Sequence, residues 1–323
     1  MLSMSRCFIA FLLVGFAHSV LAGTLFVTNE RAGTVTAIDT RSDQVITTFS
    51  ATSRPRGIAI SHDRKRLFVA VSHFRGVPTR ERDGVLEIDA SSGRVLRRHV
   101  AGTDPEGLDL SADGRQFYVA NEDAGTATAV DAQSGRTVAT FVTGTEPEGI
   151  AASPDGRYLL ITAETSSTVT VADLKTRKVI ANIFVGTRPR AVRFTRDGAQ
   201  AWVTSEIGGA VDIIDMKKLR VIKRLQLARA DHPCGLAFSP GDKRVYVATG
   251  RGNSVVVIDV ATRRIAKEIG VGQRPWWLAL TPDGRKLYVA NGLSDEISVI
   301  DTATDRVTKV IKVAGGPWGV VAR

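Results

Sequence analysis

Apolar and polar residues alternate in short runs along almost the whole chain, and the runs come in groups of four. The clearest group consists of Trp277–Thr281, Lys286–Asn291, Glu296–Asp301 and Val307–Val313. Alternation with a period of two residues predicts half-buried β-strands, and the turn sequence Pro282-Asp283-Gly284 separates the first two runs. No stretch shows the period of 3.6 residues that an amphipathic helix requires. The pattern therefore predicts an all-β protein.

The groups of four repeat at nearly constant spacing, which two landmark residues make visible. A proline precedes the first run of each group: Pro55, Pro105, Pro147, Pro189, Pro233, Pro275 and Pro317, with gaps of 50, 42, 42, 44, 42 and 42 residues. An aspartate ends the third run: Asp39, Asp89, Asp131, Asp173, Asp215, Asp259 and Asp301. Four short strands in a repeat of 40 to 50 residues are typical of a β-propeller blade. The seven prolines predict seven blades of four antiparallel strands, and the recurring aspartates are interpreted as turn residues.

The two ends of the sequence complete one another. The chain begins inside a unit, because Thr24–Thr28, Thr34–Asp39 and Val45–Phe49 read as second, third and fourth strands. It ends with Gly316–Ala322, which reads as a first strand and nothing more. The C-terminal strand is therefore expected to complete the N-terminal blade and remove two exposed sheet edges. This arrangement predicts one propeller domain over residues 23–323.

Residues 1–22 have the form of a signal peptide. Arg6 precedes an apolar run from Cys7 to Ala17, and Val20-Leu21-Ala22 is an acceptable cleavage sequence. The apolar run is shorter than the roughly 20 residues that span a bilayer. We expect cleavage after Ala22 and a periplasmic protein without a membrane span. Cys234 would then be the single cysteine, so stability would come from the core and from ring closure.

Charge adds one expectation. Lys and Arg number 43 against 33 Asp and Glu, which gives a formal net charge of +10. A basic protein attracts anions in general. The cationic residues are scattered through turns and strand ends, so an ordinary solvated basic surface competes with a dedicated polyanion site.

Three second strands carry a family resemblance. Tyr118-Val119-Ala120-Asn121, Tyr246-Val247-Ala248-Thr249 and Tyr288-Val289-Ala290-Asn291 resemble the YVTN β-propeller repeat, and the match covers residues 24–323. More narrowly, the chain resembles the periplasmic seven-repeat propeller associated with PQQ-dependent alcohol catabolism. That resemblance lies in Thr24–Glu30, Trp202–Asp215, Val271–Gly284, Asn291–Asp301 and the terminal PWGVVAR. It implies a role beside a transport system and a quinoprotein dehydrogenase. It does not imply that this chain holds the quinone cofactor, and no cofactor is predicted.

The strand order places the proline loops and the loops after the second strands on one face of the ring. This face varies from blade to blade, so we expect a ligand or partner site there, around the channel mouth. The candidate residues are Arg54, Arg56, Glu106, Glu148, Arg188, Arg190, His232, Arg274, Trp276 and Trp318 beside the prolines, with His73 and Glu206 after second strands. Arginine suits carboxylate or phosphate ligands. Alternatively, these arginines and glutamates neutralise one another across neighbouring blades.

Two irregularities and two residue classes leave alternatives open. Ser72–Asp83 holds the eight extra residues of the second blade, either as a partner-contacting lid or as an ordinary loop, and a smaller insertion lies near Ala228–Asp231. His73 and His232 could ligate a metal, but no close His or Cys spacing supports one, so none is predicted. Trp276, Trp277 and Trp318 could form a stacking surface or pack between blades.

The function predicted from these features is that of a non-enzymatic periplasmic binding or scaffold protein, which we expect to be a monomer. Its partner would be a small anionic ligand, a quinoprotein dehydrogenase, a cytochrome or a transporter component. Charge reversal at Arg188 and Arg190 is expected to weaken capture of the partner with little effect on thermal stability.

Two other functions compete with this one. A lactonase-type hydrolase would need a general base and an electrophilic stabiliser, for which Glu148 with Arg190 or Glu206 with His232 could serve, although no motif selects them. Single-stranded nucleic-acid binding would need aromatics interleaved with cations, a pattern that this face meets only loosely. Covalent haem attachment is disfavoured, because the chain lacks a C-x-x-C-H sequence.

Overall fold

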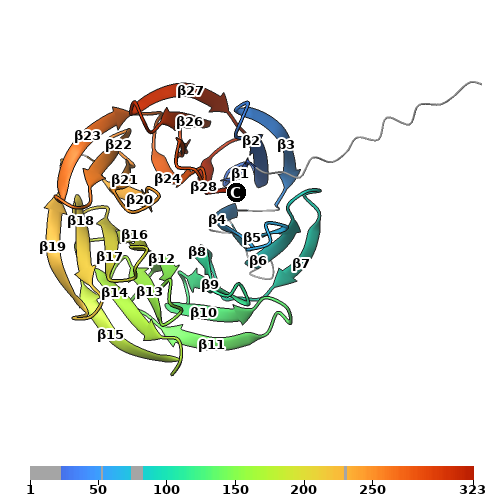
Figure 1. Ribbon diagram of the computed structural model, residues 1–323. Helices are drawn as coiled ribbons and strands as arrows, with labels where there is room; N and C mark the ends of the chain where they lie inside the picture. The colour runs from blue at the N-terminus through green and yellow to red at the C-terminus, as the bar shows by residue number, and fades with distance from the viewer. Residues whose placement is uncertain (1–22, 52–53, 74–82, 229–230) are drawn as a thin grey trace, which may run out of the picture.

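The computed structural model describes residues 23–51, 54–73, 83–228 and 231–323, which form seven four-stranded antiparallel sheets around a central axis (Figure 1). The signal-peptide prediction for residues 1–22 lies outside this range. No helix within the described ranges is long and apolar enough to cross a membrane. The predicted fold class, a seven-bladed all-β propeller with four antiparallel strands per blade, is confirmed.

Each blade consists of an innermost strand, two middle strands and an outer strand. The innermost strands are β4 (Arg54–Ile60), β8 (Pro105–Leu110), β12 (Pro147–Ala152), β16 (Pro189–Phe194), β20 (Pro233–Phe238), β24 (Pro275–Leu280) and β28 (Pro317–Ala322). The second strands are β1 (Thr24–Asn29), β5 (Arg66–Ser72), β9 (Gln116–Asn121), β13 (Tyr158–Ala163), β17 (Gln200–Ser205), β21 (Arg244–Thr249) and β25 (Lys286–Asn291).

The remaining two positions of each blade lie farther from the axis (Figure 1). The third strands are β2 (Thr34–Asp39), β6 (Gly84–Asp89), β10 (Thr126–Asp131), β14 (Thr168–Asp173), β18 (Ala210–Asp215), β22 (Ser254–Asp259) and β26 (Glu296–Asp301). The outer strands are β3 (Gln44–Ser50), β7 (Val95–His99), β11 (Thr137–Val142), β15 (Lys178–Phe184), β19 (Arg220–Gln226), β23 (Arg264–Gly270) and β27 (Arg306–Lys312).

Most innermost strands begin at the landmark proline itself, slightly earlier than the apolar alternation indicates; β4 begins one residue before its proline. Proline lacks an N–H donor and is therefore suited to the first position of a strand.

Closure of the ring by the C-terminal strand is confirmed. β28 pairs with β1 in antiparallel register, with Leu25 opposite Ala322 and Val27 opposite Val320. The first blade is therefore made from both ends of the chain, and β1 has a strand partner on each side.

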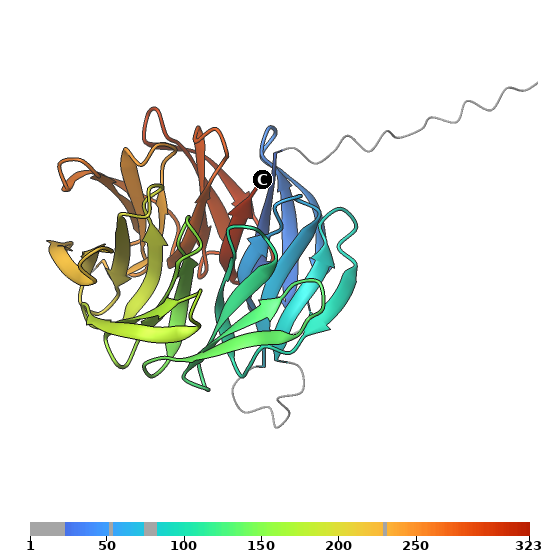
Figure 2. The ribbon, with the colours of Figure 1, turned by 60° about the horizontal axis from the view of Figure 1, so that its bottom comes forward.

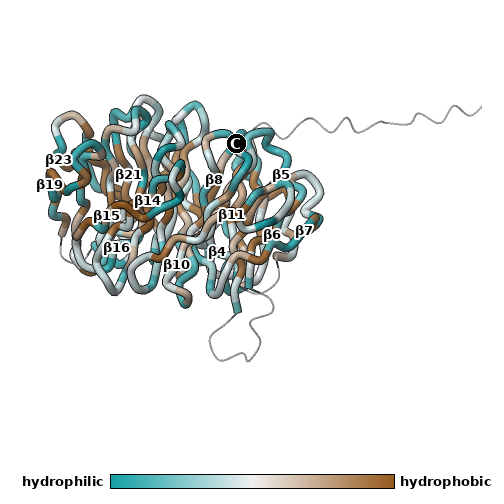
Figure 3. Tube along the Cα trace, turned by 90° about the horizontal axis from the view of Figure 1, so that it is seen from below, coloured by the Kyte–Doolittle hydropathy of each residue, from teal (hydrophilic) through white to brown (hydrophobic). Residues whose placement is uncertain are grey.

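The core lies between the blades. Seven clusters of buried side chains each join strands of neighbouring blades, and in one of them Trp202 of β17 packs with Leu236 of β20 and Val256 of β22. The strands of each blade run across the thickness of the ring, with loops at both faces (Figure 2). Hydrophobic segments follow the strands, and hydrophilic segments gather in the loops (Figure 3).

The recurring aspartates stabilise turns, as their repetition predicts. Oδ1 of Asp301 accepts hydrogen bonds from the Thr304 backbone N–H at 2.8 Å and from the Thr304 hydroxyl at 2.7 Å. These hydrogen bonds, the hydroxyl first, lower the pKa of Asp301 below its ordinary value. The Pro-Asp-Gly turn is also stabilised by a hydrogen bond to its aspartate, because the Thr281 hydroxyl donates to Asp283 Oδ1 at 2.6 Å.

Candidate functional site: the proline-side mouth

Backbone pairing brings the residues around the landmark prolines next to the ends of the second strands. Pro105 lies opposite Asn121, and the Glu122 N–H donates to the Asp104 carbonyl at 2.9 Å. The equivalent bond in the fifth blade runs from the Glu206 N–H to the Arg188 carbonyl at 2.8 Å. These two sets of residues therefore share one face of the ring, which we call the proline-side mouth.

Arg190 is the centre of one charged cluster at this mouth. Its Nη1 lies 2.9 Å from Glu148 Oε1 and also contacts Glu164, and its Nε lies 2.7 Å from Glu206 Oε2. Glu148, Glu164 and Glu206 are each less than 5% exposed. One guanidinium thus joins a carboxylate on β12 with carboxylates that follow β13 and β17, and its donors are directed at the protein rather than at open space.

Arg54 and Arg56 form a second cluster on the far side of the acidic blades. Both place Nε close to Glu30 Oε1, at 2.9 Å and 3.0 Å, and Arg56 also contacts the fully buried Glu106 through Nη1. Arg54 Nη1 lies 3.2 Å from Asp104 Oδ1. The pairing of arginine and glutamate across neighbouring blades, raised above as an alternative, is therefore present at both ends of the acidic region.

The clusters contain carboxylates of two electrostatic kinds. Burial alone would raise the pKa of Glu206, but the charges of Arg190 and Arg274 outweigh it and hold that pKa below its ordinary value. Burial raises the pKa of Glu164 to about 8, and the neighbouring Glu148 carboxylate adds to the effect against the pull of Arg190. Burial also raises the pKa of Glu106 well above its ordinary range. The mouth therefore holds carboxylates that favour the protonated form beside others that favour the charged form.

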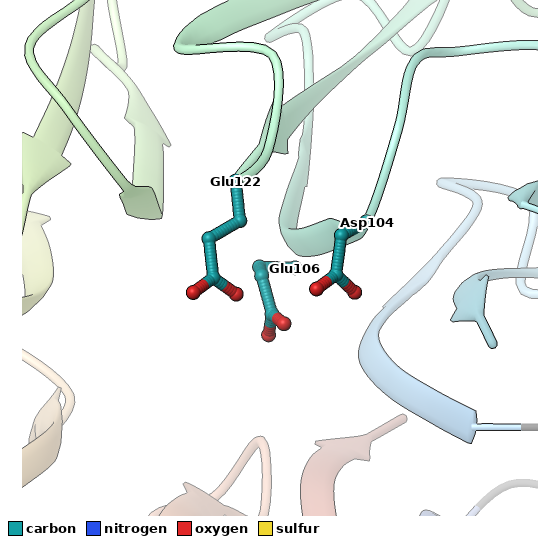
Figure 4. Close-up of side chains that lie close together, drawn as sticks. All are labelled: Asp104, Glu106 and Glu122. Carbon is teal, nitrogen blue, oxygen red and sulfur yellow. The ribbon is translucent and has the colours of Figure 1, made fainter. Parts of the chain in front are cut away.

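Asp104, Glu106 and Glu122 bring three carboxylates together, with ligand oxygens within 4.8 Å of one another (Figure 4). Asp104 and Glu106 flank the start of β8, and Glu122 follows β9. Carboxylate oxygens are ligands for hard cations. However, Arg54 and Arg56 already contact Asp104 and Glu106, so guanidinium groups supply the compensating positive charge. These contacts favour an ion-pair network over a metal site.

The tryptophans lie beside the arginines. The Arg274 guanidinium carbon lies 4.1 Å from the ring centroid of half-buried Trp276, and that of Arg190 lies 5.6 Å from the same ring. Trp318 is buried and lies 5.3 Å from Trp277, centroid to centroid. Thus Trp276 has part of its surface at the mouth, whereas Trp318 packs against neighbouring side chains. Trp318 therefore packs between blades, whereas a stacking role for Trp276 stays a prediction.

The histidine candidates do not come together. His73 Nδ1 lies 2.8 Å from Asp83 Oδ1, at the two ends of the long loop of the second blade. The insertion Ser72–Asp83, interpreted above as either a partner-contacting lid or an ordinary loop, falls mostly on residues 74–82, outside the described residues. His232 has a φ of 50° and accepts the Gly250 N–H through its carbonyl at 2.9 Å. No group of three potential metal ligands within the described ranges includes either histidine.

One feature of this face escaped the sequence analysis. Ile207 and Leu293, each on a loop after a second strand, are 55% and 63% exposed. Leu293, Arg251 and Arg274 line a cavity of about 380 Å³ between neighbouring loops. We call the set of Arg188, Ile207, Arg251, Arg274, Trp276 and Leu293 the recognition patch. In the sequence, the two aliphatic residues on otherwise polar loops are the signal that could have indicated this patch.

The architecture defines the class as a seven-bladed β-propeller, with clusters of paired arginines and carboxylates at one mouth of the ring. Residues 83–195 and 234–320 match the family described as YNCE-like beta-propeller, so the chain belongs to that family. No curated protein matches this sequence.

Solved structures share the fold at low sequence identity. The hydrazine synthase of Kuenenia stuttgartiensis is 24% identical, with a TM-score of 0.78 over 88% of this chain and 93% of the other. A functionally unknown protein from Desulfotomaculum acetoxidans is 17% identical, with a TM-score of 0.78 over 93% of this chain and 98% of the other. A putative 6-phosphogluconolactonase from Bacteroides fragilis is 20% identical, with a TM-score of 0.76 over 93% of this chain and 97% of the other. These similarities concern the fold alone.

Proposed function

We propose that this chain is a non-enzymatic periplasmic propeller that binds an acidic protein partner through the recognition patch and serves PQQ-dependent alcohol catabolism. The observation that carries the binding role is the exposure of Ile207 and Leu293 beside cationic side chains. Exposed aliphatic side chains together on one face are a mark of contact surfaces.

The positive charge of the recognition patch indicates that the partner surface is acidic. Arg188 is 46% exposed through its side chain, and Arg251 is also exposed. Arginine is enriched at interfaces, and its planar fork pairs with carboxylates of an opposing surface. A partner surface with acidic residues around an apolar centre would complement this patch.

The assignment to alcohol catabolism rests on the blade-specific stretches described above, such as Trp202–Asp215 and Val271–Gly284. It proposes a quinoprotein dehydrogenase, a cytochrome or a transporter component as the partner. No cofactor is assigned to this chain. Export by residues 1–22 and location in the periplasm form part of the same proposal.

The contacts at the mouth give little support to the hydrolase alternative. A lactonase would need a base and a cationic group that both face a substrate carbonyl. Arg190 instead directs its donors at Glu148, Glu164 and Glu206, and these three carboxylates are buried. A lactone hydrolysis assay across several ring sizes tests this directly, and turnover that Glu148→Gln abolishes would support the hydrolase instead.

The binding proposal is tested by capture on the immobilised mature protein. Periplasmic extract from alcohol-grown cells is applied to the wild type, Arg188→Glu and Leu293→Ser, and a purified quinoprotein alcohol dehydrogenase is applied in parallel. Arg285→Glu is the matched control, because Arg285 is 86% exposed through its side chain in a turn on the opposite face. We expect both patch variants to lose a captured protein that the control retains.

Arg190 is unsuitable for this test, although the sequence analysis grouped it with Arg188. It is held by three buried carboxylates, so its charge reversal would disturb the fold as well as the surface. Arg188 is more exposed, but its Nε lies 2.8 Å from Glu164 Oε2 and 3.2 Å from Glu206 Oε2, so thermal unfolding first verifies that Arg188→Glu keeps the fold. If Arg188→Glu and Leu293→Ser capture the same proteins as the wild type, the recognition patch is not the contact surface. Capture by wild type of nucleic acid alone, lost with added salt, would favour the nucleic-acid alternative.

A further inference from the structure

Three residues of the innermost strands break the sevenfold repeat inside the channel. Two positions after the landmark proline, five blades have glycine and one has Ala191, but β24 has Trp277. Four positions after the proline, five blades have alanine or valine, but β8 has Asp109 and β16 has Arg193. The fold is built from small apolar residues at these positions in the other blades, so the fold itself does not require these exceptions.

The three exceptions line two adjoining spaces below the proline-side mouth, and Arg193 borders both. A cavity of about 350 Å³ is lined by Asp109 and Arg193 and opens among the turns of the opposite face, where Ser111 and Ser153 lie. A narrower space toward the mouth is lined by Arg193, Trp277 and Trp318. Ile58, Leu108 and Val320 border both spaces. A volume of this size falls in the range of small-molecule sites.

Arg193 provides a cation whose orientation is fixed. Its Nη1 donates to the carbonyls of Ile150 at 3.2 Å and Val192 at 2.9 Å. Its guanidinium carbon lies 5.5 Å from the ring centroid of Trp277. Within the described chain the hydrogen bonds of Arg193 use Nη1, which leaves Nε and Nη2 to meet an anion in the cavity.

Asp109 provides a carboxyl group opposite Arg193, from the innermost strand of a blade two places away in the ring. Its Oδ1 and Oδ2 accept the backbone N–H groups of Leu110 and Ala152, each at 2.9 Å. Burial raises its pKa, and the charge of Arg193 partly offsets that rise. Asp109 and Arg193 form no ion pair within 4.0 Å in the part of the chain that the structure describes. A carboxyl and a guanidinium that face one cavity without pairing leave room for a molecule between them.

We propose that this cavity binds a compact organic acid that carries a hydroxyl or ammonium group and an apolar body. The carboxylate of the ligand meets Arg193, its donor group meets Asp109, and its apolar body packs against Trp277, Ile58 and Leu108. The site is separate from the recognition patch, because it opens on the opposite face of the ring.

Four probes separate the parts of this proposal in isothermal titration calorimetry on the mature protein. Phenyllactate and phenylalanine carry all three features, phenylpropionate lacks the donor group, and phenylethylamine lacks the carboxylate. We expect saturable binding of the first two, weaker binding of phenylpropionate, and no binding of phenylethylamine. The ammonium of phenylalanine makes its affinity more sensitive to Asp109→Asn than that of phenyllactate.

Substitution by the residues of the other blades gives variants that the fold tolerates. Arg193→Ala, Asp109→Ala and Trp277→Gly each restore the common residue, and thermal unfolding verifies the fold of each. Arg193→Ala should weaken phenyllactate binding by about tenfold or more, because it removes a charge-assisted hydrogen bond. Arg285→Gln is the control, because Arg285 is exposed and lines neither space, and this variant should bind as the wild type does.

The proposal is overturned if neither phenyllactate nor phenylalanine binds saturably at millimolar concentration. It is equally overturned if a folded Arg193→Ala binds them as tightly as the wild type, or if phenylethylamine binds as well as phenylpropionate. None of these outcomes bears on partner capture through the recognition patch, so the two proposals fail separately.

Discussion

The Tyr288 hydroxyl donates a hydrogen bond of 2.6 Å to Asp43 Oδ1, across the seam between the last complete blade and the blade shared by both ends of the chain. Lys286 Nζ lies 2.7 Å from the other oxygen of the same carboxylate. Burial raises the pKa of Tyr288, and the Asp43 carboxylate raises it further, so the phenol stays protonated and keeps donating. This side-chain contact between blades supplements the backbone pairing of β28 with β1 inside the shared blade.

Removal of residues 317–323 should destabilise the whole ring. The deletion removes β28, exposes the edge of β1, and leaves the innermost position of the first blade empty. We expect a lower Tm and a broader transition by calorimetry, because neighbouring blades share their cores. A truncated mature protein that unfolds at the wild-type temperature would show that the C-terminal strand does not close the ring.

Tyr288→Phe should lower the free energy of unfolding by about 1 kcal/mol, the usual net value of one hydrogen bond. The ring packing is retained, so the loss isolates the contact with Asp43. Urea denaturation measures it, and Tyr118→Phe in the corresponding strand β9 is the matched control. Equal losses in the two variants would mean that the seam contact contributes nothing specific.

The raised pKa of Glu164 should appear in the pH dependence of stability. Its pKa is about 8 in the folded state and near 4.5 in the unfolded chain, so folding takes up a proton between these values. The unfolded state then binds fewer protons, and stability falls as pH rises from about 5 to 8. The contribution is fully present below the unfolded pKa and is lost as pH passes the folded pKa.

Glu164→Gln should flatten this dependence, because the amide has no proton to lose. The maximal difference in slope is about 1.4 kcal/mol per pH unit for one proton. Thermal unfolding at several pH values measures it for both proteins. Parallel curves for wild type and variant would show that Glu164 does not take up this proton.

Cys234 should resist thiol reagents in the folded protein. Its side chain is buried beside the mouth, and burial raises the pKa of its thiol to about 12. The reactive thiolate is therefore scarce at neutral pH, and the reagent has no access to the sulfur. Labelling should be slow in the native protein and rapid in denaturant. Rapid labelling of the native form would reveal local opening of β20.

The repeat made the fold predictable, while the chemistry of the mouth depended on contacts that no repeat reveals. Pro55 and its six equivalents predicted the number of blades. The incomplete groups of strands at the two ends of the chain predicted how the ring closes. Sequence position could place Arg188 and Arg190 on the same face. It could not show that Arg190 is enclosed by three carboxylates while Arg188 remains half exposed, because side-chain direction decides that difference.

Because the proline-side loops vary from blade to blade, the sequence predicted a site at that mouth and none inside the channel. Asp109, Arg193 and Trp277 were visible in the sequence as departures from the repeat. The adjoining spaces that they line can be recognised only once the innermost strands are arranged around one axis. Ile207 and Leu293 were equally visible in the sequence. Only their exposure in the structure separates them from the many aliphatic residues that pack between blades.

The glycines two positions after the landmark prolines should be the most sensitive small residues in the ring. A Cβ added to Gly149 would lie 2.2 Å from the backbone oxygen of Arg190 on the neighbouring innermost strand. Backbone cannot move aside as a flexible side chain can, so Gly149→Ala must push β12 and β16 apart. We expect a loss of about 1–3 kcal/mol in the free energy of unfolding, the usual cost of overpacking. Gly270→Ala is the matched control, because a Cβ there meets nothing within 4 Å, and its effect should stay within about 0.5 kcal/mol. Urea denaturation compares the two variants. A Gly149→Ala protein as stable as Gly270→Ala would mean that the innermost strands lie farther apart than the structure places them.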